Sequence, residues 1–456
     1  MERKLGAKIK QWYREDLEHP LLIQGARRTG KTALVEHVGK ELVGDGFIKL
    51  DFQTNLPTIE TIFDGPTDDI DRIVARIAEY KRVEVDPQRM LLFLDEVQLS
   101  EKALNSLRFF AGSPWRVVAS GSLLGVTTKQ RKLPFPSGVR QLNMHPLDFE
   151  EYLWAMGELS MAKAIREHVG SCEPYILHEQ TLELYRRYLV VGGMPLPLSR
   201  YVQTRKLEAA TVELAEIDAT YTADMTDPDN GISGISAKRI WDSLPKQLLR
   251  SSTKKFKYAE VVRGGRRERL LEPLEWLEAA GIITRNDLTK DTTAPLAPFN
   301  DEEGSFFKVY VADTGLMSHK FGIDTQLLLD PGVSAMLSSD FRGALAENFV
   351  MQSLKASNLR TFYWMPDEDS SRGEVDFVLQ TVRGEVVPVE VKSARNVRSR
   401  SLKKLMSEGR APYAVRLSEQ NFSRTPNAGN PADNDGLPEL LSLPLYAAFA
   451  IEQLVK

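Results

Sequence analysis

The chain has 456 residues, which corresponds to about three domains of ordinary size, each able to bury its own core. Its formal net charge of −4 excludes a general polycation, so any contact with nucleic acid must come from local basic patches. The single Cys172 excludes an internal disulfide, and it shows no zinc-ligand spacing with the six histidines. No stretch approaches about eighteen uninterrupted apolar residues and the first residues lack an apolar signal segment, so we expect a cytoplasmic protein without a membrane partner.

Residues 20–145 alternate short apolar runs with helical patterns. The runs are LLIQG, GFIKLDF, MLLFLDE and WRVVASGS, and stretches such as DIDRIVARIAEY lie between them. Short runs rich in Leu, Ile, Val and Phe are typical of strands that are covered on both faces. The pattern predicts an α/β domain built on a parallel sheet.

The segment GARRTGKT lies between the first predicted strand and a predicted helix, and it matches G-x-x-x-x-G-K-[ST]. Its glycines allow several backbone N–H groups to face one anion, and the helix N-terminus adds its dipole. We expect Lys31 to reach the β- and γ-phosphates of a nucleotide and Thr32 to bind Mg²⁺. The predicted nucleotide-binding loop comprises Gly25, Ala26, Arg27, Arg28, Thr29, Gly30, Lys31 and Thr32.

Two acids, Asp95 and Glu96, follow the apolar run MLLFL, as a Walker B strand requires. Asp95 would hold Mg²⁺ through water, and Glu96 would orient and polarise the attacking water. Ser120 and Ser122 end the next run. A polar group there could sense the γ-phosphate, although a strand-ending Ser-Gly turn explains the pattern equally well.

These motifs carry a resemblance. GARRTGKT, LLFLDEVQ, ASGS and GVRQLNMHPLDFEEYL together resemble the AAA+-type ATPase domain of a large family of prokaryotic ATP-binding proteins, whose members also carry a C-terminal domain of unknown function. The resemblance covers nearly the whole chain and implies ATP. It also places Arg140 and Arg27 at usual arginine positions. Arg140 could sit near the phosphates in cis or in a neighbouring subunit of a homo-oligomer, but both arginines could equally be structural.

The middle of the chain, from about 150 to 250, is predicted to be mostly helical. After it, KYAEVV, a Gly-Gly turn and RRERLLEPLEWLEAAGIIT form a helix-turn-helix pattern that resembles a winged helix with its β wing. Eight basic residues lie in this segment against Glu260 and Glu268: Arg250, Lys254, Lys255, Lys257, Arg263, Arg266, Arg267 and Arg269. They could neutralise the phosphates of DNA, or they could be the solvated face of a packing module.

Four polar residues stand out in the last part of the chain. Glu347 lies on a predicted helix, Asp376 on a strand, and Glu390 and Lys392 share one face of the next strand. Converging carboxylates and a lysine are what a hard divalent cation and an attacking water require, with Asp376 and Glu390 as metal ligands. The pattern resembles the PD-(D/E)xK nuclease core, although Val375 replaces the motif's proline.

We therefore predict an α/β protein in three parts: an AAA+-type P-loop ATPase domain over residues 1–155, a helical and winged-helix region over 156–320, and a restriction-endonuclease-like α/β domain over 321–456. The predicted function is an ATPase with ATP and Mg²⁺ as cofactors, coupled to binding or cleavage of nucleic acid, with DNA favoured over RNA. One alternative is an ATP-dependent switch whose C-terminal module binds DNA or a protein without cutting. A weaker alternative is a toxin-like or defence effector.

Overall fold

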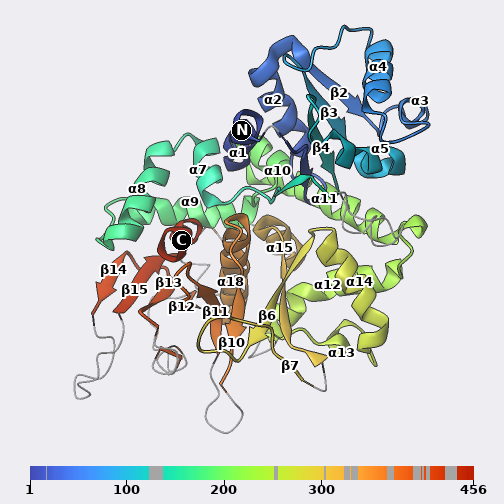
Figure 1. Ribbon diagram of the computed structural model, residues 1–456. Helices are drawn as coiled ribbons and strands as arrows, with labels where there is room; N and C mark the ends of the chain where they lie inside the picture. The colour runs from blue at the N-terminus through green and yellow to red at the C-terminus, as the bar shows by residue number, and fades with distance from the viewer. Residues whose placement is uncertain are drawn as a thin grey trace. The chain divides into compact units, whose positions relative to one another are not determined.

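The computed structural model describes residues 1–16, 18–122, 137–250, 255–301, 304–322, 329, 337–366, 374–393, 402, 405–406, 411–426 and 439–456. By its contacts the chain divides into two compact units (Figure 1). We call Met1–His145, Thr226–Ile232 and Glu275–Gly281 the N-terminal unit, and we call Pro146–Met225, Ser233–Leu274 and Ile282–Lys456 the C-terminal unit. The boundaries of the three predicted domains remain a prediction.

The N-terminal unit is built on a five-stranded sheet with the order β2-β3-β4-β1-β5. Each strand pairs in parallel with its neighbours in this order. The strands are β1 (Leu21–Gln24), β2 (Phe47–Asp51), β3 (Leu91–Asp95), β4 (Arg116–Gly121) and β5 (Arg140–Asn143). The predicted parallel α/β sheet is therefore confirmed.

Alternation along these strands fills a core on each face of the sheet. Ile23, Leu91 and Phe93 pack with residues of α1 (Lys4–Glu15) and α2 (Lys31–Val43) on one face. Leu22 and Leu92 pack with residues of α3 (Leu56–Ile62), α4 (Ile70–Lys81) and α5 (Glu101–Ser106) on the other. Because both faces are covered, the strands read as nearly continuous apolar runs in the sequence.

The C-terminal unit begins with the helices that the sequence predicts from about 150 onward. They are α7 (Phe149–Met156), α8 (Leu159–Ser171), α9 (His178–Val191), α10 (Pro195–Thr204), α11 (Leu207–Thr226) and α12 (Gly234–Arg250). The helix-turn-helix pattern forms α13 (Tyr258–Val261) and α14 (Arg267–Ala279), of which the part from Glu275 onward belongs to the N-terminal unit. Leu270, Leu274 and Leu277 on α14 are buried, as their spacing predicts.

A mixed eight-stranded sheet completes this unit, with the order β14-β15-β13-β12-β11-β10-β6-β9. Its strands are β6 (Ile283–Thr289), β9 (Phe307–Val311), β10 (Phe362–Trp364), β11 (Val375–Gln380), β12 (Val386–Val391), β13 (Tyr413–Ser418), β14 (Ser423–Thr425) and β15 (Glu439–Pro444). The predicted wing strands, β6 and β9, pair with each other, and β6 also pairs with β10. The wing and the C-terminal strands thus belong to one sheet, while the winged-helix and endonuclease-like assignments stay predictions.

Two further helices position the polar residues of this sheet. The helix α15 (Thr314–Phe321) follows β9 directly, and α18 (Ser339–Ala356) packs against β9 and β12 (Figure 1). Nearly every residue of α18 from Ala344 to Leu354 is buried, so its polar side chains face other polar groups inside the unit. Over the described part of the chain, no helix has the length and apolarity to span a bilayer.

Candidate functional site

The segment 25–30 connects β1 to α2 at the carboxyl end of the parallel strands. Gly30 is the N-cap of α2 and has φ 91°, in the left-handed region that favours glycine. A Cβ on Gly25 would lie 2.2 Å from the Met144 carbonyl oxygen, so no larger residue fits there. The path of the loop therefore requires glycine at both positions of the motif.

The side chain of Lys31 turns back over this loop. Its Nζ donates to the carbonyl oxygens of Gly25 and Ala26, at 2.9 Å each, and the residue is only 5 % exposed. Burial lowers the pKa of Lys31 to about 8, although the carboxylates of Glu96 and Asp95 oppose the shift. The Lys31 ammonium is thus hydrogen-bonded within the loop and interacts with the carboxylates of Glu96 and Asp95.

The loop is also tied to the start of the chain. Arg3 Nη1 donates to the Thr29 carbonyl oxygen at 3.1 Å, and Nη2 donates to the His145 carbonyl oxygen at 2.6 Å. Thr29 Oγ1 donates to the Ala26 carbonyl oxygen at 2.9 Å. Arg28 is exposed, with φ 67°, and Arg27 is half-buried. Arg3 lies 26 positions before Thr29 and outside the loop motif, so the motif does not predict this contact.

Asp95 at the end of β3 lies beside Thr32. Its Oδ1 accepts a hydrogen bond from Thr32 Oγ1 at 2.9 Å and another from Ser120 Oγ at 2.5 Å. Asp95 is 2 % exposed, and Ser120 is fully buried at the end of β4. The structure thus brings together the end of the loop motif, the acid that ends β3 and the serine near the end of β4.

Glu96 follows Asp95 and has φ 59°, an uncommon value for a non-glycine residue that occurs more often at functional sites. Its Oε2 accepts hydrogen bonds from Ser122 Oγ and Gln98 Nε2, at 2.6 Å each. Burial opposes the charged form, but the Lys31 ammonium and these hydrogen bonds outweigh it and hold the pKa of Glu96 below its usual value. Glu96 is therefore a fixed carboxylate that faces Lys31.

The four polar residues predicted in the C-terminal part come together. Asp376 on β11 accepts a hydrogen bond at Oδ2 from the Val391 backbone N–H at 2.8 Å, and Glu390 lies on the adjacent strand β12. Lys392 Nζ lies 2.8 Å from Glu390 Oε1. Burial opposes the charge of Lys392, but Asp376, Glu390 and Glu347 raise its pKa. One cluster thus contains the acids and the lysine that the sequence singled out.

The sequence analysis missed Lys308, which lies at the centre of this cluster. It is fully buried on β9, its Nζ bonds Glu374 Oε1, and it lies 3.5 Å from Glu347 Oε2 and 4.0 Å from Asp376 Oδ1. Burial opposes its charge, but Glu374 and its other acidic neighbours raise the pKa of Lys308 well above the usual value. The same burial raises the pKa of Glu374 to about 7, against the effect of Lys308.

The cluster also contains the guanidinium of Arg416 and two buried carboxylate oxygens, one of Glu390 and one of Glu374. Arg416 Nε lies 3.9 Å from Glu390 Oε2, an oxygen that has no hydrogen bond among the described residues. Glu374 Oε2 is likewise buried without a hydrogen bond there. Over the same residues, no group of three or more His, Cys, Asp or Glu side chains has the arrangement of a metal site. The roles of Asp376 and Glu390 as metal ligands therefore stay a prediction.

The basic segment between α12 and α14 is largely exposed. Glu260 and Glu268 are exposed beside these five exposed basic residues: Lys257, Arg263, Arg266, Arg267 and Arg269. Lys255 is half-buried, and its ammonium lies 4.2 Å from the centre of the Phe306 ring. Lys254 and the side chain of Arg250 lie outside the described residues.

Comparison with known families gives a match for the nucleotide loop and its neighbours. Residues 17–153 match the model of the AAA domain family. This part of the chain is therefore similar to AAA domains. Residues 182–327 and 342–431 match two domains of unknown function, DUF8612 and DUF4143. None of the curated proteins compared with the chain is significantly similar to it.

Solved structures give weaker likenesses. The Orc1 protein of Aeropyrum pernix in complex with DNA is 14 % identical, with 74 % of this chain and 93 % of that chain covered, at a TM-score of 0.27. AMPPCP-bound DnaA from Aquifex aeolicus is 15 % identical, with 61 % and 89 % covered, at 0.27. Cdc6p from Pyrobaculum aerophilum is 13 % identical, with 73 % and 93 % covered, at 0.25. Scores this low transfer neither an arrangement nor a function to this chain.

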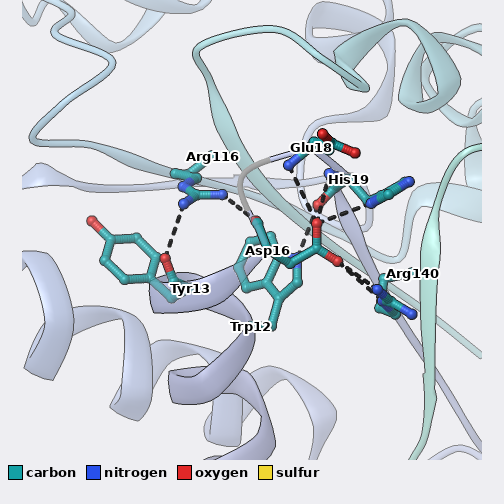
Figure 2. A network of polar contacts seen from close by, with 7 residues as sticks. All are labelled: Trp12, Tyr13, Asp16, Glu18, His19, Arg116 and Arg140. Carbon is teal, nitrogen blue, oxygen red and sulfur yellow. Dashed lines mark hydrogen bonds and ion pairs between the residues drawn. The ribbon is translucent and has the colours of Figure 1, made fainter.

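Within the segment that matches the AAA domain family, Arg140 does not lie beside the loop of Lys31. It begins β5, opposite Leu21 at the start of β1, whereas the loop follows the other end of β1. Both Nε and Nη2 of Arg140 donate to Asp16 Oδ2, at 3.0 and 2.9 Å (Figure 2). The expected position near the phosphates in cis is therefore wrong, and a role in a neighbouring subunit stays a prediction.

Figure 2 shows what holds Arg140 at this end of the sheet. Asp16 Oδ1 also accepts hydrogen bonds from the backbone N–H groups of Glu18 and His19, and the side chain contacts the His19 ring. Burial opposes the charge of Asp16, but the bonds from His19 and Arg140 outweigh it and lower its pKa to about 2. The same residues line a cavity of about 670 Å³ together with Trp12. Arg140 is thus paired with Asp16 within this chain.

Proposed function

We propose that the chain is a Mg²⁺-dependent ATPase whose AAA domain is coupled to nucleic-acid binding, or cleavage, by the C-terminal unit. The observation that carries the first part is the hydrogen bond from Thr32 Oγ1 to Asp95 Oδ1. It joins the last residue of the loop motif to the acid that ends β3. These two groups are the pair that holds Mg²⁺ in P-loop ATPases.

The residues of the loop fit a nucleoside triphosphate. Glycine at position 25 lets the loop pass close to the Met144 carbonyl, where a Cβ would clash, and the backbone N–H groups at the start of α2 favour an anion. Lys31 would contact the β- and γ-phosphates, while Thr32 and Asp95 would hold the cation directly and through water. When bound, Mg²⁺ neutralises charge on the phosphates. No change of fold is needed for these roles.

Glu96 would orient the attacking water and accept its proton. It is suited to this role because Ser122 and Gln98 fix its Oε2 and because its pKa is held low, so it is ionised at neutral pH. Ser120 bonds Asp95 and accepts from the Glu96 backbone N–H at 3.3 Å, which fixes the two acids relative to each other. Hydrolysis of ATP by the full chain, with Mg²⁺ and with EDTA, tests this part; no Mg²⁺-dependent turnover would contradict it.

The nucleic-acid part of the proposal rests on two features of the C-terminal unit. Exposed Arg263, Arg266 and Arg267 lie at the helix-turn-helix and could contact phosphates. Asp376, Glu390 and Lys392 lie together in the acid cluster, where Glu390 Oε2 is an unsatisfied buried acceptor that a cation would bind. Binding and cleavage of plasmid, linear and single-stranded DNA, with and without ATP, test it. The absence of both, while ATP hydrolysis is intact, would contradict it.

A second candidate is favoured by Lys308. Its ammonium pairs with Glu347, Glu374 and Asp376, so much of the negative charge that would attract a divalent cation is already compensated. The C-terminal unit would then bind DNA or a protein partner under the control of ATP, without cutting. DNA binding without cleavage in Mg²⁺ or Mn²⁺, and no effect of Asp376→Ala on any activity, would select this switch.

A further inference from the structure

Three carboxylates surround one lysine at the carboxyl end of β2 and β3. Lys49 Nζ lies 2.8 Å from Asp95 Oδ2, 2.9 Å from Glu36 Oε1 and 3.3 Å from Asp51 Oδ2. An ammonium has three N–H donors, so each carboxylate can receive one. Lys49 is the single charged residue in the run FIKL, and it belongs to none of the motifs described above.

The elements around Lys49 fix its position. Alternation along β2 places Lys49 and Asp51 on the same face, and the register sets Asp51 opposite Asp95 on β3. Glu36 comes from α2, the helix that begins at Lys31. The Lys49 ammonium also lies 5.9 Å from the centre of the Phe93 ring. The lysine is therefore held from three elements, two of which also carry the residues of the nucleotide site.

The two oxygens of Asp95 are divided between the nucleotide loop and Lys49. Oδ1 accepts from Thr32 and Ser120, while Oδ2 pairs with Lys49. A divalent cation beside Thr32 would lie on one side of the Asp95 carboxylate, with the Lys49 ammonium on the other side. Two positive charges at this separation repel each other. Without the ammonium, the oxygens of Glu36, Asp51 and Asp95 would be the kind of ligands that a hard divalent cation prefers.

We propose that Lys49 is a positioning residue that holds Asp95 for the metal and keeps free divalent cations out, so that the cation enters only with the phosphates of the nucleotide. This inference rests on the proposed ATPase function. The phosphates supply the negative charge that overcomes the repulsion by Lys49. The nucleotide-free protein should therefore have a low affinity for Mg²⁺ or Mn²⁺ at this place.

The test measures Mn²⁺ binding to the nucleotide-free full chain by electron paramagnetic resonance of the unbound ion. We expect Lys49→Met to bind one Mn²⁺ at least about tenfold more tightly than wild type, because the carboxylates lose their cation. Lys49→Met/Asp95→Asn should lose this added binding. Lys40→Met removes a charge from an exposed position of α2 and should behave as wild type. Mn²⁺ sites elsewhere in the chain are common to all variants and cancel.

Equal Mn²⁺ affinity in wild type and Lys49→Met would overturn the inference, as would added binding that persists in the double variant. Should Lys49→Met not fold, Glu36→Gln/Lys49→Met keeps the local net charge of wild type and must still bind Mn²⁺ more tightly. A purely structural lysine would change the unfolding temperature but not this affinity.

A second measurement separates this inference from the proposed function. Binding of a fluorescent ATP analogue is followed against Mg²⁺ concentration, and Lys49→Met should reach half-saturation at several-fold lower Mg²⁺ than wild type. If Lys31→Ala leaves analogue binding unchanged, the ATPase proposal is wrong whatever Mn²⁺ does. If Lys31→Ala abolishes analogue binding but Lys49→Met shifts neither Mn²⁺ nor Mg²⁺, only the role of Lys49 is wrong.

Discussion

Lys308 Nζ lies 3.5 Å from Glu347 Oε2, so the helix acid of the predicted nuclease core shares a buried ion pair with a lysine of β9. The same ammonium bonds Glu374, which directly precedes β11 and stands two residues before Asp376. A strand that the sequence assigned to a wing thus supplies the cation of the acid cluster. Because a buried pair is costly to break, this relationship has direct consequences for stability and for metal binding.

Lys308→Met should lower the free energy of unfolding by about 3–5 kcal/mol, because it leaves buried carboxylates without their cation. Adding Glu374→Gln removes the carboxylate that Lys308 bonds directly and should recover part of the loss. Denaturation by urea, followed by circular dichroism, measures both variants. A loss below about 1 kcal/mol in Lys308→Met, the range of exposed ion pairs, would show that the cluster is not an energetically coupled buried network.

Calorimetric titration with Mg²⁺ or Mn²⁺ decides between a nuclease and a switch. If Asp376 and Glu390 share a cation, Asp376→Asn should lower metal affinity and DNA cleavage together, because a hard cation loses an anionic oxygen. Lys392→Ala removes no metal ligand, so metal should still bind while cleavage is lost. Arg416→Ala, which also removes a cation near Glu390, serves as the matched control for charge. Equal affinity in wild type and Asp376→Asn would mean that no metal binds there.

Contiguous motifs allowed the nucleotide loop, Asp95 and Glu96 to be predicted, because a P-loop and its Walker B acids are set by local strand–turn–helix geometry. Lys49 and Lys308 could not be predicted in the same way. Each is one lysine inside an apolar run, FIKL and FFKVYV, and its acidic partners come from elements far away in the sequence. A lysine on the covered face of a strand is the one signal that could have been noticed.

The position of Arg140 and the pairing of the wing strands show a second limit. The family resemblance implies that Arg140 could lie near the phosphates, but it begins β5 while the loop follows the end of β1. In a parallel sheet these two positions lie at opposite ends of the strands. A four-residue strand separates them by roughly 10 Å. Likewise, the pattern of β6 and β9 predicts strands but not that β6 pairs with β10. Pairing is decided by packing, which no local pattern contains.

Lys31→Ala and Glu96→Gln should separate nucleotide binding from turnover in the proposed ATPase. Lys31→Ala removes the cation that meets the phosphates, so binding of an ATP analogue should weaken strongly. Glu96→Gln keeps the loop intact but cannot accept a proton, so kcat should fall by about 10²–10⁴-fold while binding is spared. Phosphate release and analogue fluorescence measure the two effects. Wild-type turnover in Glu96→Gln would contradict the proposed role of Glu96 in positioning the attacking water.

Charge reversal at Arg266 and Arg267 tests whether the exposed basic segment contacts DNA. If both side chains contact phosphates, their change to Glu should weaken binding and reduce the slope of log affinity against log salt by about 2. Arg14→Glu/Lys40→Glu makes the same change of charge at exposed helix positions of the N-terminal unit and should leave the slope unchanged. Fluorescence anisotropy over a salt series gives both values. An unchanged slope in the first variant would mean that the segment is only a packing module.

Asp313 should make the stability of the C-terminal unit depend on pH. It is fully buried at the N-cap of α15, where it accepts from the backbone N–H groups of Leu316 and Gly193 at 3.0 and 2.6 Å. Burial raises its pKa from 3.8 to about 6, although these bonds oppose the shift. Because the folded-state pKa lies above the unfolded one, the contribution of Asp313 is fully present below about pH 4 and is lost as pH rises through about 6.

The difference between wild type and Asp313→Asn isolates this contribution from the other acids of the chain. Asn cannot accept at both positions, so the variant carries a constant cost from one unsatisfied N–H, whereas its own side chain does not titrate. The advantage of wild type in free energy of unfolding should therefore fall by roughly 3 kcal/mol between about pH 4 and pH 7. Urea denaturation across this range measures it, with Asp45→Asn, an exposed carboxylate, as the control. An advantage that is constant or grows with pH would mean that Asp313 stays ionised when buried, held by its hydrogen bonds rather than neutralised by burial.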